Sequence, residues 1–149
     1  MTYWHMSLYP NNNKDWNSEL ELLETKFLIG IGLNKEENNP QIEQFKKMEE
    51  GDIVLIKDRF QFALALVKII GKNEEVEKID NYLDWFVFRR KIEIITLDIK
   101  EKLDFRLPPA RLSKSKDKTT NLYQFIDQIY KSNVQIIEST AIIEENTIP

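Results

Sequence analysis

The sequence predicts an α+β protein, a small mixed and mostly antiparallel β-barrel with helices at its periphery. Residues 51–70, GDIVLIKDRFQFALALVKII, hold two apolar runs around a polar tip of Lys57, Asp58 and Arg59, which is the pattern of a β-hairpin. The second run is apolar at nearly every position, so both faces of this strand are expected to be covered. Such a strand lies centrally in a curled sheet.

The chain before the hairpin supplies further elements. Residues 2–8, TYWHMSL, are expected to form a strand. Ser18 and Glu21 have the spacing of a capping box and predict the start of a short helix. Residues 27–33, FLIGIGL, then form a second buried strand. Its two glycines alternate on one face, which indicates either barrel curvature or the close approach of another group.

A second helix is expected directly before the hairpin. Asn39 is its predicted N-cap, Pro40 occupies its first position, and Gly51 lies where a C-terminal glycine is expected. Its buried stripe consists of Ile42, Phe45 and Met48.

The elements after the hairpin are less regular. Residues 85–98, WFVFRRKIEIITLD, predict a long strand, and the pair Arg89-Arg90 within it suggests a bulge or an exit from the core. Residues 99–118 show no convincing periodicity.

The C-terminal part of the chain predicts one helix and one strand. Thr119 or Thr120 is expected to cap the helix, whose apolar face consists of Leu122, Phe125, Ile126, Ile129 and Tyr130. Residues 134–138 are expected to form a last strand. Residues 1–140 would then be a single domain, and residues 141–149 a flexible tail.

Composition excludes several classes of function. There is no cysteine and one histidine, which excludes a disulfide framework, cysteine-based zinc sites and a thiol nucleophile. No G-x-x-x-x-G-K-[ST] motif occurs. We therefore expect no catalytic residues, no metal site and no cofactor, and no enzymatic activity.

Nothing in the sequence indicates a membrane or an export signal. The apolar runs are far shorter than the about 20 residues that span a bilayer. The first ten residues lack the basic and apolar regions of a signal peptide. The chain is therefore expected to be cytoplasmic, without a membrane partner.

Charge is distributed unevenly along the chain. The net charge is −4, which argues against a sequence-blind polyanion binder. Residues 85–120, however, hold ten Lys or Arg against five acids, a local charge of +5, whereas the first 84 residues carry −6. This basic third fits a localised phosphate contact, and a solvated surface is the alternative. The candidate phosphate-binding residues are Arg59, Arg89, Arg90, Lys91, Arg111, Lys114 and Lys116.

Aromatic residues gather at strand ends and loops. Trp4, Trp16, Trp85 and Phe60 are either core and rim filler or a cage that stacks a flat ligand such as an extruded base. Small polar groups near the same loops are candidates for reading the edge of a base by hydrogen bonds. They are His5, Ser7, Asn11 and Asp58.

The opening YWHMSLYPNNNKDW resembles the start of EVE-type domains of the PUA-like superfamily. The following order is also similar: FLIGIGL, a helix ending in KKMEEGDIVLIKD, a returning strand ALALVKIIG, and WFVFRRKI. The similarity is closest to the PUA-like N-terminal domains of McrB-type motor subunits in modification-dependent restriction systems. It covers residues 2–98. G-D-x-V after a helix is common in the superfamily, whereas W-H-x-S with a second tryptophan is narrower.

The resemblance implies a curved barrel with a pocket at one end. Relatives bind nucleic acid, and EVE and YTH members hold a modified base in an aromatic pocket. On the matching motifs, the pocket would be formed by Trp4, His5, Ser7, Trp16, Asp58, Phe60 and Trp85. Motor or nuclease activity would reside in other domains or in partner subunits.

The leading hypothesis is therefore a non-catalytic recognition domain for methylated DNA that flips a base into an aromatic pocket. Two alternatives stay open: an RNA-binding PUA-like module, and a protein-interaction module that uses the barrel surface.

Overall fold

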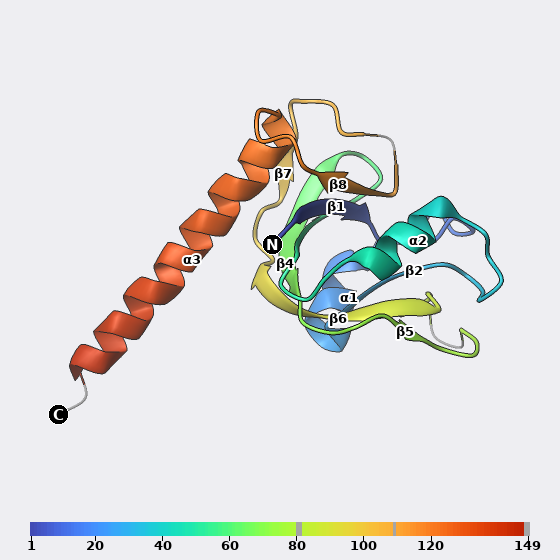
Figure 1. Ribbon diagram of the computed structural model, residues 1–149, viewed down its shortest axis with the longest axis horizontal. Helices are drawn as coiled ribbons and strands as arrows, with labels where there is room; N and C mark the ends of the chain where they lie inside the picture. Colours follow the sequence, from blue (N-terminus) through green and yellow to red (C-terminus); the bar gives the residue numbers. More distant parts are fainter. Residues whose placement is uncertain (80–81, 109, 148–149) are drawn as a thin grey trace.

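The computed structural model describes residues 1–79, 82–108 and 110–147, with side chains of the last helix described up to Gln135 (Figure 1). The helices are α1 (Glu19–Lys26), α2 (Pro40–Lys47) and α3 (Asn121–Thr147). The strands are β1 (Tyr3–Ser7), β2 (Leu28–Ile31), β3 (Ile53–Lys57), β4 (Phe62–Ile69), β5 (Glu74–Glu75), β6 (Phe88–Thr96), β7 (Glu101–Lys102) and β8 (Leu112–Ser115). No helix in the described part of the chain is long and apolar enough to cross a membrane.

The strands form one curled sheet, so the predicted mixed α+β class is confirmed. Its order is β2-β6-β4-β3-β1-β8, with β5 added to β6 and β7 added to β4. β1 and β3 run parallel, and the other pairs are antiparallel. The first half of β6 pairs with β2 and its second half with β4. This one strand therefore carries the sheet around the bend of a half-barrel.

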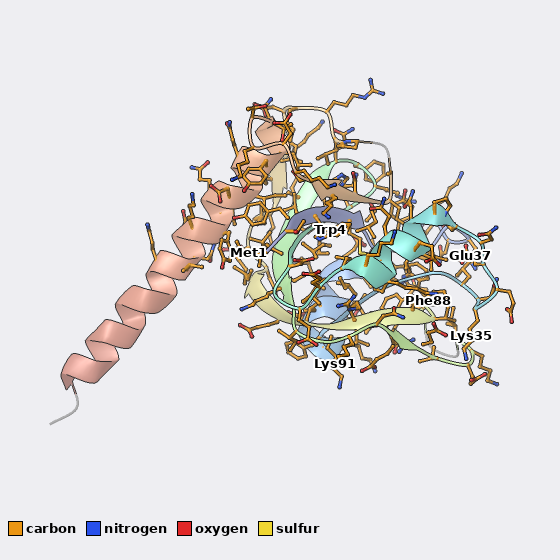
Figure 2. All side chains as sticks on the ribbon, viewed as in Figure 1. Met1, Trp4, Lys35, Glu37, Phe88 and Lys91 are labelled. Atoms are coloured by element: carbon orange, nitrogen blue, oxygen red, sulfur yellow. The ribbon has the colours of Figure 1, made fainter. Side chains whose placement is uncertain are left out.

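Side chains that alternate along β1 face two different hydrophobic cores. Trp4 and Met6 belong to a core within the curl of the sheet, together with Phe45 of α2. Figure 2 shows Trp4 and Phe88 within the body of the molecule, while Lys91 points outward. Tyr3 belongs to a second core, between the sheet and the start of α3.

Helix α3 begins on the sheet and then leaves it. Thr120 caps the helix, because its hydroxyl oxygen accepts the N–H of Tyr123 at 3.2 Å. The predicted apolar face packs on the second core, and the hydroxyl of Tyr3 donates to Asp127 at 2.7 Å. Beyond this contact the helix projects away from the barrel (Figure 1).

One prediction at the C-terminus is wrong. Residues 134–138 are not a strand, because they continue α3, which runs on to Thr147 through most of the predicted tail. A short β-branched run does not by itself distinguish a strand from a helix segment, and a helix that is already nucleated propagates through it. Residues 148–149 of the predicted tail lie outside the described residues.

The hairpin prediction is confirmed, because β3 and β4 pair antiparallel and Leu66 is completely buried. The predicted tip was wrong in one residue. Lys57 ends β3 and is 6% exposed, so the tip consists of residues 58–61. There the Asp58 carboxylate accepts the N–H groups of Phe60 and Phe62 at 2.7 and 3.0 Å. These two bonds fix the shape of the tip.

The predicted irregularity at Arg89-Arg90 is also wrong. Pairing between β2 and β6 is continuous there, and the register shifts between Leu66 and Val67, opposite residues 94–96. Arg90 does not leave the core either, because it is only 3% exposed.

Two of the predicted helix ends differ from the structure. Ser18 precedes α1 but makes no side-chain capping bond. Helix α2 has the predicted Asn39 cap, whose side chain accepts the N–H of Gln41, but its C-cap is Met48 rather than Gly51. Gly51 instead has a φ of 95° in the turn before β3.

Gly30, the first glycine in FLIGIGL, permits a close approach by an aromatic ring. A Cβ added to Gly30 would lie 1.8 Å from the ring of Phe86. The ring therefore packs directly on the backbone of β2, and any side chain at this position would displace it.

Candidate functional site

Two adjoining cavities lie where β1 ends and the β3–β4 turn begins. The first, called the aromatic cavity, has a volume of about 620 Å³ and is bordered by Tyr9, Trp16, Glu19, Leu20, Phe60 and Leu64. The second, called the basic cavity, has about 390 Å³ and is bordered by Ser7, Asn11, Lys57, Arg59, Arg106 and Arg111. Tyr9, Asp58 and Arg59 border both. The aromatic cavity has the size of an ordinary small-molecule site.

Phe60 is the exposed aromatic residue of this region. Its side chain is 70% exposed at the fixed tip of the hairpin, and the Arg59 guanidinium lies 5.0 Å from its ring centroid. Gln61 follows with a φ of 62°, a left-handed conformation that turns the chain back into β4. A large apolar ring held out in this way is suited to stacking on a flat ligand.

Trp16 borders the same cavity from the loop before α1. It is 2% exposed, and its indole N–H donates to the carbonyl of Tyr82 at 3.1 Å. Trp16 is therefore a fixed wall of the cavity rather than a free stacking platform. The structure brings Trp16, Asp58 and Phe60, three of the predicted pocket residues, to one cavity.

Glu19 is a residue of this cavity that the sequence analysis missed. It is 5% exposed, and its Oε1 atom has no hydrogen-bond partner among the described residues. Burial raises the pKa of its carboxyl to about 7, and the nearby charge of Asp58 acts in the same direction. The only sequence signal, the first turn of a helix, pointed to a solvated acid.

The basic cavity holds three of the predicted polar residues, Ser7, Asn11 and Asp58. Arg111 crosses its wall: the guanidinium donates to the Tyr9 carbonyl and to the Asn11 side-chain oxygen, and it stacks 4.6 Å from the centre of the Tyr9 ring. Its pKa is lowered by burial.

His5 does not border either cavity, so it is removed from the predicted base-reading set. It is completely buried, and neither ring nitrogen has a partner among the described residues. Burial lowers its pKa to about 4, and the positive charge of Lys57 contributes. The imidazole near Lys57 is therefore neutral at physiological pH.

Trp4 and Trp85 are separated from the aromatic cavity. The Trp4 indole N–H donates to Asp52 at 3.0 Å, and its ring belongs to the core within the sheet. The Trp85 N–H donates to the Leu8 carbonyl at 2.8 Å. Trp85 borders a crevice of about 10 Å³ beside Asn11, which has room for about one water molecule.

Two of the predicted phosphate-binding arginines have structural partners instead. The buried Arg90 donates to the carbonyls of Gly71, Phe45 and Met48. Arg89 pairs with Asp84 at 3.0 Å and donates to the Phe86 carbonyl. We therefore remove Arg90 from the phosphate-binding set, because its guanidinium is not accessible.

The remaining predicted cations divide between two faces. Lys114 and Lys116 border a third cavity of about 740 Å³ at the start of α3, and Arg106 borders both this cavity and the basic cavity. We call five cations the basic band: Arg106, Arg111, Lys114 and Lys116 of the 105–116 segment, and Arg59 of the hairpin tip. Lys91 lies elsewhere, 4.0 Å from Glu74. Among the described residues, no group of three or more His, Cys, Asp or Glu is arranged to hold a metal ion.

Comparisons with known proteins add little to this geometry. No family model matches the chain, and no curated protein matches it. A crystal structure of protein Atu2648 from Agrobacterium tumefaciens is similar at a TM-score of 0.46 and 13% identity, over 89% of this chain and 93% of that one. An NMR structure of Rpa0253 from Rhodopseudomonas palustris is similar at a TM-score of 0.37 and 14% identity, over 63% of this chain. The match spans 62% of the length of that protein.

Proposed function

We propose that this chain is an EVE-type, PUA-like recognition domain that binds modified DNA and accepts an extruded base in the aromatic cavity. It has no catalytic role of its own and serves a McrB-type restriction system, in which motor and nuclease activities belong to other domains or subunits. The observation that carries the proposal is the meeting of Trp16, Phe60 and a buried, unpartnered Glu19 oxygen in one cavity beside a basic one.

The two cavities divide the chemistry that a nucleotide requires. Phe60 offers the face of an aromatic ring, and base stacking on such a ring is worth about 1–3 kcal/mol. The unpartnered Oε1 of Glu19 is an acceptor for an amino group on the edge of a base. The basic cavity and the band beyond it supply cations for phosphates.

The energy balance explains why several contacts are needed. Extruding a base from a duplex costs a few kcal/mol, which stacking on Phe60 offsets in part. Phosphate contacts supply the remainder. A methyl group buried against the cavity wall contributes about 0.8 kcal/mol, so contact alone favours a methylated base only a few-fold. Stronger discrimination requires easier extrusion of the modified base or rejection of the unmodified one.

The test compares affinities for matched duplexes that carry a methylated or an unmodified base, for single strands and for RNA. Phe60→Ala is expected to weaken binding of the preferred ligand by about 1–3 kcal/mol, because one stacked base loses its platform. A fluorescent base analogue at the target position should brighten on binding to the wild type and not to the variant.

Phe27→Ala is the matched control, because Phe27 is also exposed, at 47%, but borders a groove at a different site. Equal losses from both variants would contradict a specific role for the aromatic cavity. Preference for RNA over every DNA ligand would establish the RNA-binding alternative instead.

One observation favours the protein-interaction alternative. Phe27 and Ile70 are 47% and 48% exposed and border an apolar groove of about 570 Å³ over β6. If no nucleic acid binds at low salt while Phe27→Ser and Ile70→Ser reduce assembly with a partner protein, this alternative holds.

A further inference from the structure

The basic cavity has a wall composition that the proposed base recognition does not require. Among the described residues that border it, Lys57, Arg59, Arg106 and Arg111 are cationic and Asp58 is the single carboxylate. The oxygen Oδ1 of Asp58 already accepts two backbone N–H groups of the hairpin tip. The cavity therefore carries a local excess of positive charge.

Lys57 is the most unusual of these cations. It is 6% exposed, and its ammonium donates to one carbonyl, that of Pro108, at 3.5 Å. In the described part of the chain it forms no ion pair, and its electrostatic neighbour is the buried ring of His5. Buried charges in proteins are normally paired, because leaving one unpaired costs several kcal/mol. The side chain borders the cavity, so a counterion can reach it from there.

The neutral side chains around the cavity are arranged as donors. The side-chain oxygen of Asn39 accepts the Gln41 N–H, that of Gln41 accepts the Leu112 N–H, and that of Asn11 accepts from Arg111. All three side chains border the cavity, and each has an NH₂ group that can donate to a ligand there. A cavity of cations and N–H donors is complementary to a ligand that carries several acceptor oxygens and negative charge.

We propose that the basic cavity binds one phosphate group, with Lys57 as its central ligand and Arg111 as a second, prepositioned cation. This site rests on the proposed function, which already assigns phosphates to the basic cavity, and names the residues that would hold one of them; the site itself requires no base. The phosphate belongs either to a nucleic-acid backbone or to a free phosphate compound, and the chemistry is the same for both.

The direct test is a titration with inorganic phosphate at constant ionic strength, with chloride as the balancing anion. The Cε signals of the lysines are followed by NMR. The Lys57 signal is expected to shift saturably and the Lys68 signal to stay unchanged, because Lys68 lies on β4 outside the cavity. Absence of a saturable Lys57 shift would overturn the proposal, whatever the behaviour of any variant.

Lys57→Met is the matching variant, with Lys68→Met as its control. Methionine keeps an unbranched apolar stem and removes the charge, so folding should be retained or improved. Phosphate affinity should fall at least about ten-fold in Lys57→Met, the loss expected for one charge-assisted hydrogen bond, and should stay unchanged in Lys68→Met. Unchanged affinity in Lys57→Met would refute the assignment.

Two further ligands distinguish the sources of the phosphate. One ligand is an oligonucleotide in which a single phosphate is replaced by a neutral methylphosphonate. If this replacement lowers the affinity of the wild type as much as Lys57→Met lowers the affinity for the unmodified oligonucleotide, the site binds the nucleic-acid backbone. If a nucleoside monophosphate shifts the Lys57 signal while oligonucleotides do not, it takes a small phosphate compound. Inorganic phosphate has no base, so the titration can fail while Phe60-dependent binding persists, and the two proposals are separable.

Discussion

Replacing Glu19 with Gln is expected to stabilise the protein at neutral pH and not at acid pH. Glu19 is 5% exposed, its Oε1 atom has no hydrogen-bond partner in the part of the chain that the structure describes, and burial raises its pKa from 4.5 to about 7. The folded state therefore resists ionisation of this carboxyl. Gln has nearly the same shape as Glu but carries no charge. The variant therefore removes the desolvation cost of burying an ionised carboxylate without changing the packing.

The sign and size of the effect follow from linkage. Below pH 4.5 the carboxyl is protonated in both the folded and the unfolded protein, so it contributes no pH dependence. Between pH 4.5 and 7 the folded state holds the proton more tightly, so the free energy of unfolding falls as pH rises. A pKa raised from 4.5 to about 7 corresponds to about 3 kcal/mol. The wild type should thus lose about 3 kcal/mol relative to Glu19→Gln across this window.

Urea unfolding of both proteins at intervals from pH 4.5 to 8 measures this difference directly. Glu21→Gln is the control, because Glu21 is exposed on the same helix, and its unfolding free energy should follow that of the wild type at every pH. If the Glu19→Gln and wild-type curves are parallel within about 0.5 kcal/mol, then ionisation of Glu19 costs the folded state nothing and the argument from its burial is refuted.

Three other outcomes are expected. If the basic band contacts the DNA backbone, affinity should fall steeply with salt, and Lys114→Gln or Lys116→Gln should each reduce the slope of log K against log salt by about one, as measured by fluorescence anisotropy. Gly30→Ala should destabilise the fold by 1–3 kcal/mol or more in chemical denaturation, because the added Cβ meets the Phe86 ring at 1.8 Å. Asp52→Ala should lower the free energy of unfolding by about 3–5 kcal/mol in the same measurement, since the Asp52 carboxylate accepts the backbone N–H groups of Thr2 and Glu49 and the indole N–H of Trp4.

The local sequence pattern was sufficient to predict the elements that contain their own turn and capping signals. The hairpin 51–70 has two apolar runs around a polar tip, and Asn39-Pro40 and Thr120 cap helices in the expected way. Strand β8, Leu112–Ser115, was not predicted, because Leu-Ser-Lys-Ser has no strand periodicity. Its conformation is set by pairing with β1, which lies more than a hundred residues away in the chain.

The candidate site shows why side-chain roles are harder to predict than strands. Arg90 and Lys57 are both basic residues at strand positions, and the sequence suggested a phosphate contact for one and a solvated tip for the other. In the structure both are buried, yet they differ in what surrounds them. Arg90 meets three backbone carbonyls, which accept hydrogen bonds from its Nε and Nη1 atoms.

Lys57 meets one carbonyl at 3.5 Å and a neutral imidazole, at the edge of a cavity rich in N–H donors. Among the described residues, the fold gives Arg90 three carbonyl acceptors and Lys57 one, at a longer distance. An anion bound beside Lys57 would compensate its buried charge, whereas Arg90 already has acceptors within the fold. The distinction depends on carbonyls and amides contributed by α2 and by loops distant in the chain, and no property of the two residues themselves encodes it.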